Sequence, residues 1–288
     1  MRLGALGGAR TVTLDYNTIA RINVLVPRSV PGRARKAWAR VQAEAMAQSS
    51  NKKGLLPNLT PVLILNKRRY GNKNESYADR IIRHCDMWLR RDFQGLLEDV
   101  KQATSKTQPK RNLSKEDIAL KKVETGQVTS AMNVLKSTNG LADPEDPAVQ
   151  ARMQAKHPFG ATIETPANLP QAAALHITAK EAVKLLKSAE RGKSAGPSRL
   201  TNEMVREACL DKSEEGSGAL NAFITYVNTF IDGAFNPTQA PFINAARLIA
   251  KIKTEEDERP IAIGEVLRRL VCHYLAVKHG LDAIGSWF

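Results

Sequence analysis

The sequence has few of the features that mark membrane, secreted or disulfide-stabilised proteins. It holds three cysteines, Cys85, Cys209 and Cys272, and no C-x-x-C pair, which argues against a disulfide framework or a zinc site. We expect all three to be buried thiols. No apolar run approaches the roughly 18 residues that span a bilayer, and the N-terminal stretch is too polar for a signal sequence. The expectation is an intracellular protein, cytoplasmic or nuclear, without a membrane partner.

Motifs of common enzyme classes are also missing. The segment RGKS at 191–194 ends like a phosphate-binding loop, but Lys187 occupies the position that the loop reserves for glycine. The sequence has no Gly-x-Ser-x-Gly elbow, and the adjacent Cys272 and His273 point to different faces of a helix. We therefore predict no catalytic residue, no metal ligand and no cofactor within this chain.

Acidic residues are scarce relative to basic ones. The chain has 43 Lys and Arg against 29 Asp and Glu, a formal net charge of +14. Basic surfaces bind phosphate backbones and release their counterions, so RNA or DNA is the expected partner class. The alternative is a basic surface that only keeps the protein soluble.

The first 75 residues are basic and rich in turn-forming residues. We expect a loosely structured segment here, with one short apolar strand at 61–65. Arg33, Arg35 and Lys36 lie close to Trp38, which suggests a helix with a basic face and an aromatic anchor for nucleic acid. A solvated helix face with Trp38 packed inward is the alternative.

Residues 76–170 have helical periodicity and form a predicted helical extension. Apolar residues recur at steps of three and four over 77–100, which predicts one long amphipathic helix. A second helix is expected over 114–135. Asp146 followed by Pro147 is typical of the start of a third, short helix.

Residues 171–288 combine helices with one predicted β-hairpin. Thr178 and Glu181 form a capping box that begins a helix. Further helices are expected over 200–209, 220–231 and 264–279. Two apolar segments, 245–252 and 259–263, flank the polar loop TEEDE and predict an antiparallel hairpin. The predicted fold class is therefore mostly α, of the α+β type.

Three segments of this C-terminal part carry a family resemblance: KSAGPSRLTNEMVRE, VNTFIDGAFNP, and LIAKIK followed by RPIAIGEVLRRLVCHYLA. Together they resemble the N-terminal extension and fingers region of a LINE-like (non-LTR) retrotransposon reverse transcriptase. The resemblance covers 121–276 well and the first 75 residues poorly. The sequence departs from the family at Ala250, where Pro is frequent, and at Arg199, where Gly usually follows Gly-Pro-Ser.

The resemblance implies a partial right-hand polymerase fold, a helical extension followed by a helix and β-hairpin fingers subdomain, and the activity of an RNA-directed DNA polymerase. It implies that Lys251 and Arg259 face the phosphates of a nucleotide, and that Lys253, Arg268 and Arg269 lie near the template. The family holds magnesium on aspartates of the palm, downstream of the fingers. Because the chain ends before them, we expect it to be inactive alone and to need magnesium only together with a palm. Without the palm, we also expect apolar residues at the C-terminal end to be exposed, including Leu270, Tyr274, Trp287 and Phe288.

Two interpretations stay open at this point. In the first, the chain is part of a reverse transcriptase. In the second, it is a non-enzymatic, basic, helical module that binds nucleic acid through 33–40 and 83–91, and Lys251, Lys253 and Arg259 are ordinary strand charges. The two differ in whether Arg259 matters for nucleotide affinity.

Overall fold

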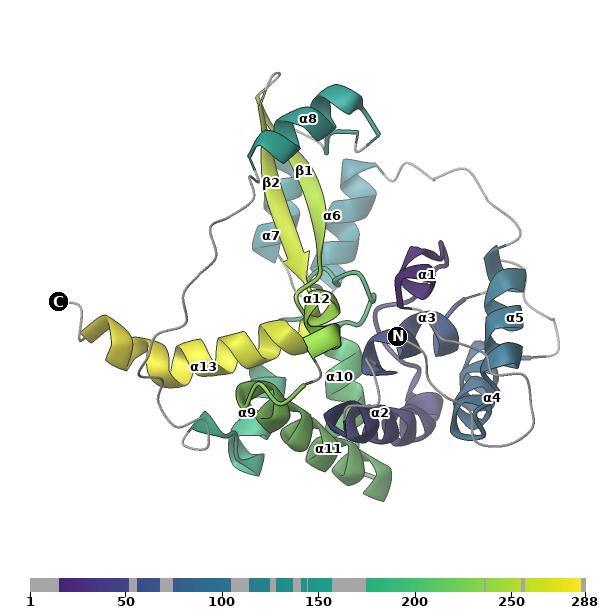
Figure 1. Cartoon of the computed structure of the whole chain (residues 1–288). Coiled ribbons are helices and arrows are strands. Elements are labelled where there is room, and N and C mark those ends of the chain that lie inside the picture. Colours follow the sequence, from purple (N-terminus) through teal and green to yellow (C-terminus); the bar gives the residue numbers. More distant parts are fainter. Residues whose placement is uncertain are drawn as a thin grey trace. The chain divides into compact units, whose positions relative to one another are not determined.

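A computed structural model of the chain is mostly helical, with one two-stranded antiparallel sheet (Figure 1). It describes residues 16–51, 56–67, 75–104, 114–124, 128–136, 141–143, 145–156, 175–235, 237–254 and 257–285. The α+β class is thus confirmed. Among the described residues, no helix has both the length and the hydrophobicity to cross a bilayer.

The chain folds into two compact units, each assembled from separate segments. Unit 1 comprises Met1–Gln108, Gln171–Ala245 and Glu265–Phe288, and unit 2 comprises Pro109–Pro170 and Ala246–Gly264. One change of unit coincides with the boundary that we expected after residue 170, but no change of unit falls after residue 75. The chain enters and leaves unit 2 twice, so linear reading along the sequence could not find this division.

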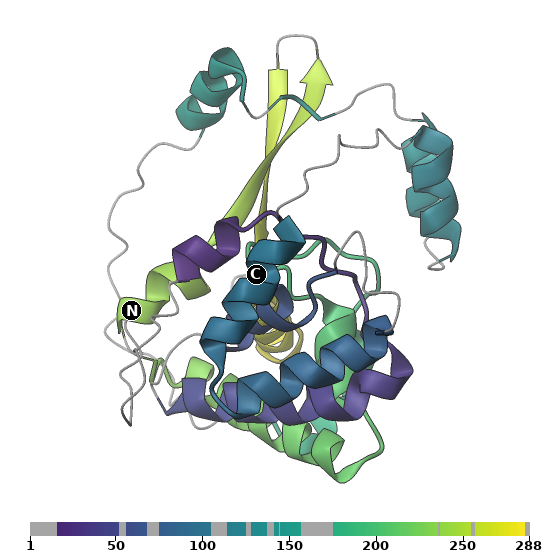
Figure 2. The same cartoon turned by 90° about the vertical axis from the view of Figure 1, so that its right-hand side faces the viewer.

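Unit 1 contains ten α-helices in its described part: α1 (Tyr16–Arg21), α2 (Arg35–Ser50), α3 (Leu56–Ile64), α4 (Tyr77–Leu89), α5 (Phe93–Thr104), α9 (Ala179–Ser188), α10 (Asn202–Cys209), α11 (Glu214–Ile231), α12 (Ala240–Ile243) and α13 (Val266–Gly285). Unit 2 contains α6 (Lys115–Glu124), α7 (Val128–Lys136), α8 (Pro147–Ala155), β1 (Ala246–Thr254) and β2 (Asp257–Gly264). Figure 2 shows α2, α4 and α5 from a second side.

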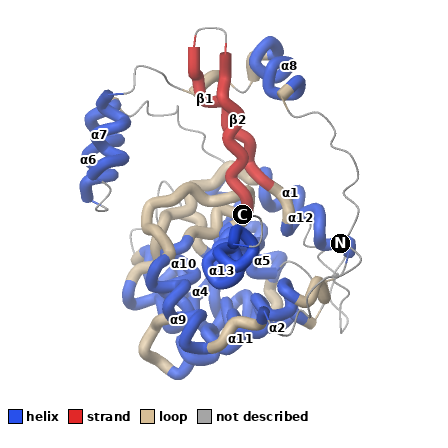
Figure 3. Tube along the Cα trace, turned by 90° about the vertical axis from the view of Figure 1, so that its left-hand side faces the viewer, coloured by secondary structure: helices blue, strands red, loops and turns tan. Residues whose placement is uncertain are grey.

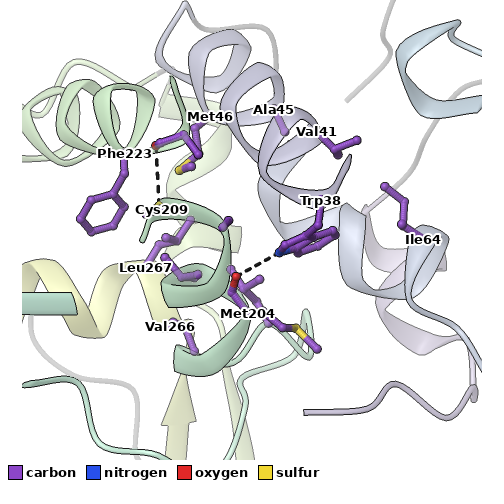
Figure 4. Close-up of a cluster of buried hydrophobic side chains, with 14 of the residues drawn as sticks. Trp38, Val41, Ala45, Met46, Ile64, Met204, Cys209, Phe223, Val266 and Leu267 are labelled. Carbon is purple, nitrogen blue, oxygen red and sulfur yellow. Dashed lines mark hydrogen bonds between the residues drawn. The ribbon is translucent and has the colours of Figure 1, made fainter. Parts of the chain in front are cut away.

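Helix α2 lies at the centre of unit 1 and packs against α4, α10 and α11. Trp38 is fully buried, and its indole Nε1 donates to the carbonyl oxygen of Met204 at 3.0 Å (Figure 4). Burial of so large a ring stabilises the unit by several kcal/mol, of the order of 3 to 5. The expected loose structure is therefore wrong for 16–51 and 56–67, and the alternative with Trp38 packed inward is confirmed.

The strand expected at 61–65 is also wrong, because most of this segment belongs to α3. A short, continuously apolar run fits a buried helix as well as a strand, and periodicity cannot separate the two. Pro61 lies inside α3 and lacks the N–H that would bond four residues back. The hydroxyl of Thr60 donates to the carbonyl of Pro57 at 2.8 Å and so satisfies the acceptor that Pro61 leaves free.

The long helix expected over 77–100 is two helices, α4 and α5. Arg91 adopts φ 64°, a left-handed conformation that ends α4. The carboxylate of Asp92 then accepts from the amide of Gly95 at 3.0 Å and caps α5. Apolar periodicity continues through this turn, which is why the sequence pattern did not reveal it. The helix expected over 114–135 is likewise α6 and α7.

The predicted helix starts at Asp146 and Thr178 are confirmed. Asp146 accepts from the amide of Ala148, and Thr178 and Glu181 form the reciprocal capping box. The amide and hydroxyl of Thr178 hold the pKa of Glu181 at about 2.

Two expectations about exposure at the C-terminal end need correction. Cys272 is exposed, unlike Cys85 and Cys209. Leu270 and Tyr274 of α13, which we expected to be exposed without a palm, are buried in unit 1. Trp287 and Phe288, expected to be exposed with them, lie outside the described residues.

Candidate nucleic-acid interface

The predicted hairpin is formed by β1 and β2, the red strands of Figure 3. In its antiparallel register Lys251 lies directly opposite Arg259. Residues opposite one another project from the same face of a sheet, and successive residues along a strand alternate between faces. Lys251 and Arg259 therefore share one face, while Ala250 and Glu258 project from the other.

Helix α8 covers the face that carries Ala250 and Glu258. Ala250 is buried together with Val149 and Met153 of the helix. Arg152 of α8 donates to both carboxylate oxygens of Glu258, from Nε at 2.9 Å and from Nη2 at 2.5 Å. This bidentate bond lowers the pKa of Glu258. On the covered face of the hairpin, Ala250 thus makes apolar contacts and the charge of Glu258 is balanced by Arg152.

The open face of the hairpin, defined as Arg247, Ile249, Lys251, Arg259 and Ile261, has a different composition. Its three cations are all exposed, Ile249 is half-buried and Ile261 is 37% exposed. Arg247 and Lys251 are four residues apart along β1, or about 13 Å. Arg247 was not among the predicted site residues. Its position four residues before Lys251 on the same predicted strand could have identified it, because residues an even number of positions apart share a face.

The charges of this face are not compensated within the described part of unit 2. Neither Lys251 nor Arg259 makes an ion pair or a side-chain hydrogen bond there, and the same holds for Arg247. Like charges directly opposite on a ladder destabilise it. An anion such as a phosphate would relieve this repulsion, so the open face is suited to bind one.

The predicted template residues that lie within the hairpin or follow it in sequence have different surroundings. Lys253 belongs to β1, but its side chain is outside the described residues. Arg268 and Arg269 are on α13 in unit 1 and donate to the carbonyls of Asn244 at 3.4 Å and Ser194 at 2.9 Å. Burial lowers the pKa of Arg269. Both arginines thus tie α13 to neighbouring loops.

The predicted cations of the N-terminal part are each paired with an acid within unit 1. The pairs are Arg33 with Asp79 at 2.8 Å, Arg35 with Glu207 at 2.9 Å, and Lys36 with Glu215 at 3.4 Å. Because their charges are already compensated, these side chains are less available to phosphates than those of the open face.

Sequence reasoning missed a buried carboxyl directly after β2. Glu265 is 1% exposed and accepts from the hydroxyl of Tyr16 at 2.6 Å, the amide of Ser198 at 2.9 Å and the hydroxyl of Ser198 at 2.5 Å. Burial raises the pKa of Glu265 and that of Tyr16. Ser198 and Glu265 lie in two of the segments that carry the family resemblance. Their membership of these segments was the one sequence feature that could have drawn attention to them.

Within the described residues, no group of three or more His, Cys, Asp or Glu side chains is placed to hold a metal ion. Comparisons with protein-family models, curated proteins and solved structures gave no match. The function of the open face therefore has to be inferred from its own residues.

Proposed function

We propose that this chain is the helical extension and fingers region of a LINE-like reverse transcriptase, an RNA-directed DNA polymerase, and that the open face of the hairpin binds the phosphates of a nucleotide. One observation carries the proposal. Lys251 and Arg259 lie directly opposite each other, both exposed, with no carboxylate partner among the described residues.

The two cations suit different parts of one anion. The planar guanidinium of Arg259 can donate two parallel hydrogen bonds to phosphate oxygens, whereas the ammonium of Lys251 acts as a compact point charge. A bound triphosphate would convert their mutual repulsion into two attractive contacts. Fixed cations of this kind also stabilise charge that develops during phosphoryl transfer.

Polymerisation further requires metal ions held by aspartates. The resemblance places these aspartates after the fingers, and the 288 residues contain neither a Phe-x-x-Asp nor a Tyr-x-Asp-Asp sequence. The proposal therefore assigns nucleotide binding, and no chemical step, to this chain. We expect no primer extension by the purified protein, and extension of a labelled primer would contradict this assignment.

Contacts within unit 1 join two of the segments on which the resemblance is based. The Gly-Pro-Ser segment and the Gly-Glu segment, distant in sequence, meet through the hydrogen bonds of Ser198 to Glu265. Arg199, at the position where the family usually has Gly, adopts φ 64°, a conformation that glycine takes without strain. The unusual residue thus keeps a glycine-like turn, and its guanidinium donates to the carbonyl of Ile22 at 2.7 Å.

The alternative, a non-enzymatic module that binds nucleic acid through 33–40 and 83–91, is less well supported. Besides the pairs of Arg33, Arg35 and Lys36, two arginines of the second segment are also engaged. Arg83 contacts Glu75 at 2.9 Å and Asp99 at 3.0 Å, and Arg91 pairs with Glu44. Arg40 and Arg90 of these segments are exposed and make no ion pair with a described residue, but Lys251 and Arg259 lie directly opposite each other. This juxtaposition of two cations favours the nucleotide-binding interpretation.

Nucleotide binding can be tested with a fluorescent deoxynucleoside triphosphate. We expect the double variant Lys251→Ala, Arg259→Ala to bind it at least about tenfold more weakly, because each charge-assisted hydrogen bond contributes about 1.5 to 3 kcal/mol. The matched control is Arg33→Ala, Lys36→Ala, which also removes one arginine and one lysine. Equal losses in the two double variants would show that only net charge matters and would contradict the site.

A further inference from the structure

Helix α9 presents a stripe of three lysines that the hairpin proposal does not use. Lys180, Lys184 and Lys187 follow one another at steps of four and three residues, so they lie on the same side of the helix. All three are exposed, and none makes an ion pair with another described residue. Lys193, a few residues further on, is by contrast paired with Glu190 at 2.8 Å. We refer to Lys180, Lys184 and Lys187 as the lysine stripe.

The stability of the helix does not account for the stripe. Lys187 lies in the last turn, where a cation interacts favourably with the helix dipole, but Lys180 lies in the first turn, where a cation is unfavourable. Lys180 and Lys184 also form a like-charge pair at a spacing that destabilises helices. The acid nearest to them in sequence, Glu181, is occupied by its capping box and by Lys278 at 3.0 Å.

The chemistry of α9 selects one class of partner. The opposite side of the helix, with Ala182, Leu185 and Leu186, is buried in the core of unit 1, so no apolar face remains to enter a lipid surface. The stripe also lacks the aromatic or arginine anchors on which protein interfaces depend. The partner that we infer is a nucleic-acid backbone, whose closely spaced phosphates bind lysine charges independently of sequence.

The spacing agrees with this partner. Lys180 and Lys187 are about 10.5 Å apart along the helix axis, a length over which one strand of a duplex rises by about three phosphate steps of 3.4 Å. Three steps span four successive phosphates. We propose that the lysine stripe of α9 contacts the phosphate backbone of RNA or DNA, with each of the three lysines on a different one of these four phosphates. The inference rests on the nucleic-acid partner of the proposed function but not on the hairpin.

The salt dependence of binding tests the stripe directly. Two labelled probes are used, a DNA duplex of mixed sequence and a single-stranded RNA of the same sequence. The protein is the whole chain. In the triple variant Lys180→Gln, Lys184→Gln, Lys187→Gln, the slope of log affinity against log salt concentration should become shallower by about 2.7 on the duplex and about 2 on the single strand. Glutamine has a helix propensity close to that of lysine, so α9 should persist.

A matched variant separates position from net charge. Lys101 of α5, Lys136 of α7 and Lys212 of the loop between α10 and α11 are also exposed, and their change to Gln removes the same charge. We expect this control to keep the wild-type slope. Equal shifts in both triple variants, or a wild-type chain that does not bind either nucleic acid, would overturn the stripe. Replacing the three stripe lysines with Arg should restore the wild-type slope, and failure to do so would also overturn it.

The result is distinguishable from that of the hairpin. If the stripe variant loses slope while Lys251→Ala, Arg259→Ala keeps wild-type nucleotide affinity, the stripe stands and the hairpin proposal fails. If the stripe variant keeps the wild-type slope while the hairpin variant loses nucleotide affinity, the hairpin proposal is supported and the stripe proposal is contradicted. Loss of binding to phosphatidylserine vesicles, with nucleic-acid binding intact, would overturn the stripe in favour of a lipid surface.

Discussion

Glu265 is almost completely buried and accepts hydrogen bonds from three donors. Replacing it with Ala or with Gln shows how much these hydrogen bonds contribute to stability. Glu265→Ala would leave the hydroxyl of Tyr16 and both donors of Ser198 without an acceptor. Unpaired buried donors of this kind should lower the free energy of unfolding by about 3 kcal/mol. Glu265→Gln keeps an acceptor and should cost much less. Urea unfolding of both variants measures the difference, and equal costs would contradict the role of these bonds.

The raised pKa of Glu265 also predicts a pH dependence. The folded state holds the proton to higher pH than the unfolded chain does, for which the ordinary value is 4.5. The stabilising contribution is therefore complete below 4.5 and is lost as pH rises through the folded pKa. Glu265→Gln cannot titrate, so stability relative to wild type should increase from pH 4.5 towards neutrality. A constant difference over this range would show that the pKa is not raised.

Arg199 allows backbone conformation to be separated from hydrogen bonding. Its φ of 64° suits glycine, while its guanidinium donates to the carbonyls of Ile22 and Val24. Arg199→Gly and Arg199→Ala both remove these bonds, but only alanine keeps the strain of the left-handed conformation. We expect the glycine variant to be more stable than the alanine variant by about 1 kcal/mol in urea unfolding. An alanine variant of equal or greater stability would exclude this conformation at position 199.

At the scale of elements, α8 and the hairpin are joined by an ion pair whose acid is nearly buried. The side chains of Arg152 and Glu258 are 40% and 5% exposed, whereas those of Arg33 and Asp79 are 71% and 40% exposed. Removing the partner of a buried charge is costly, and removing that of an exposed charge is not. Arg152→Ala should therefore accelerate amide hydrogen exchange in β1 and β2 by about an order of magnitude.

Arg33→Ala is the matched control for this prediction. Exchange in α4, which carries Asp79, should stay close to its wild-type rate because the pair is screened by water. Unchanged exchange of the hairpin in Arg152→Ala would show that α8 does not protect it. That result would leave the covered face of the hairpin without its proposed support.

The elements themselves were predictable wherever a local chemical signal marked them. The caps at Thr178 and Asp146 depend on neighbouring residues, and so do the two apolar segments that flank the polar loop of the hairpin. Sequence reasoning located all three. The turn at Arg91 and the helix around Pro61 have no such local signal. Each depends on what the segment packs against, which the sequence does not display.

The candidate site was predictable only in part for the same reason. Lys251 and Arg259 were found through the family resemblance, and their pairing follows from the register of a predicted hairpin. Glu265 was missed because its partners, Tyr16 and Ser198, are 249 and 67 residues away in sequence. The pairing of Arg33 with Asp79 was not anticipated either, because the two residues are 46 positions apart in sequence.

At the scale of the whole molecule, unit 1 joins chain segments that unit 2 separates. Trp38 bonds to Met204 across 166 residues, and Arg199 bonds to Ile22 across 177. Contacts of such long range make folding of unit 1 depend on both ends of the chain. We therefore expect the N-terminal helices and the helices after residue 171 to unfold together, despite their distance in sequence.

The three cysteines provide a test of this cooperativity. Cys85 on α4 and Cys209 on α10 are buried in the same core, burial raises the pKa of each thiol, and Cys272 is exposed. A thiol reagent should therefore label Cys272 rapidly in the native protein, and the other two only after denaturation or slow opening. If unit 1 opens as one body, Cys85 and Cys209 react at equal rates, as measured by mass spectrometry of the labelled peptides. Much faster labelling of Cys85 would mean that the N-terminal helices open on their own, and rapid reaction of all three thiols would contradict the common core.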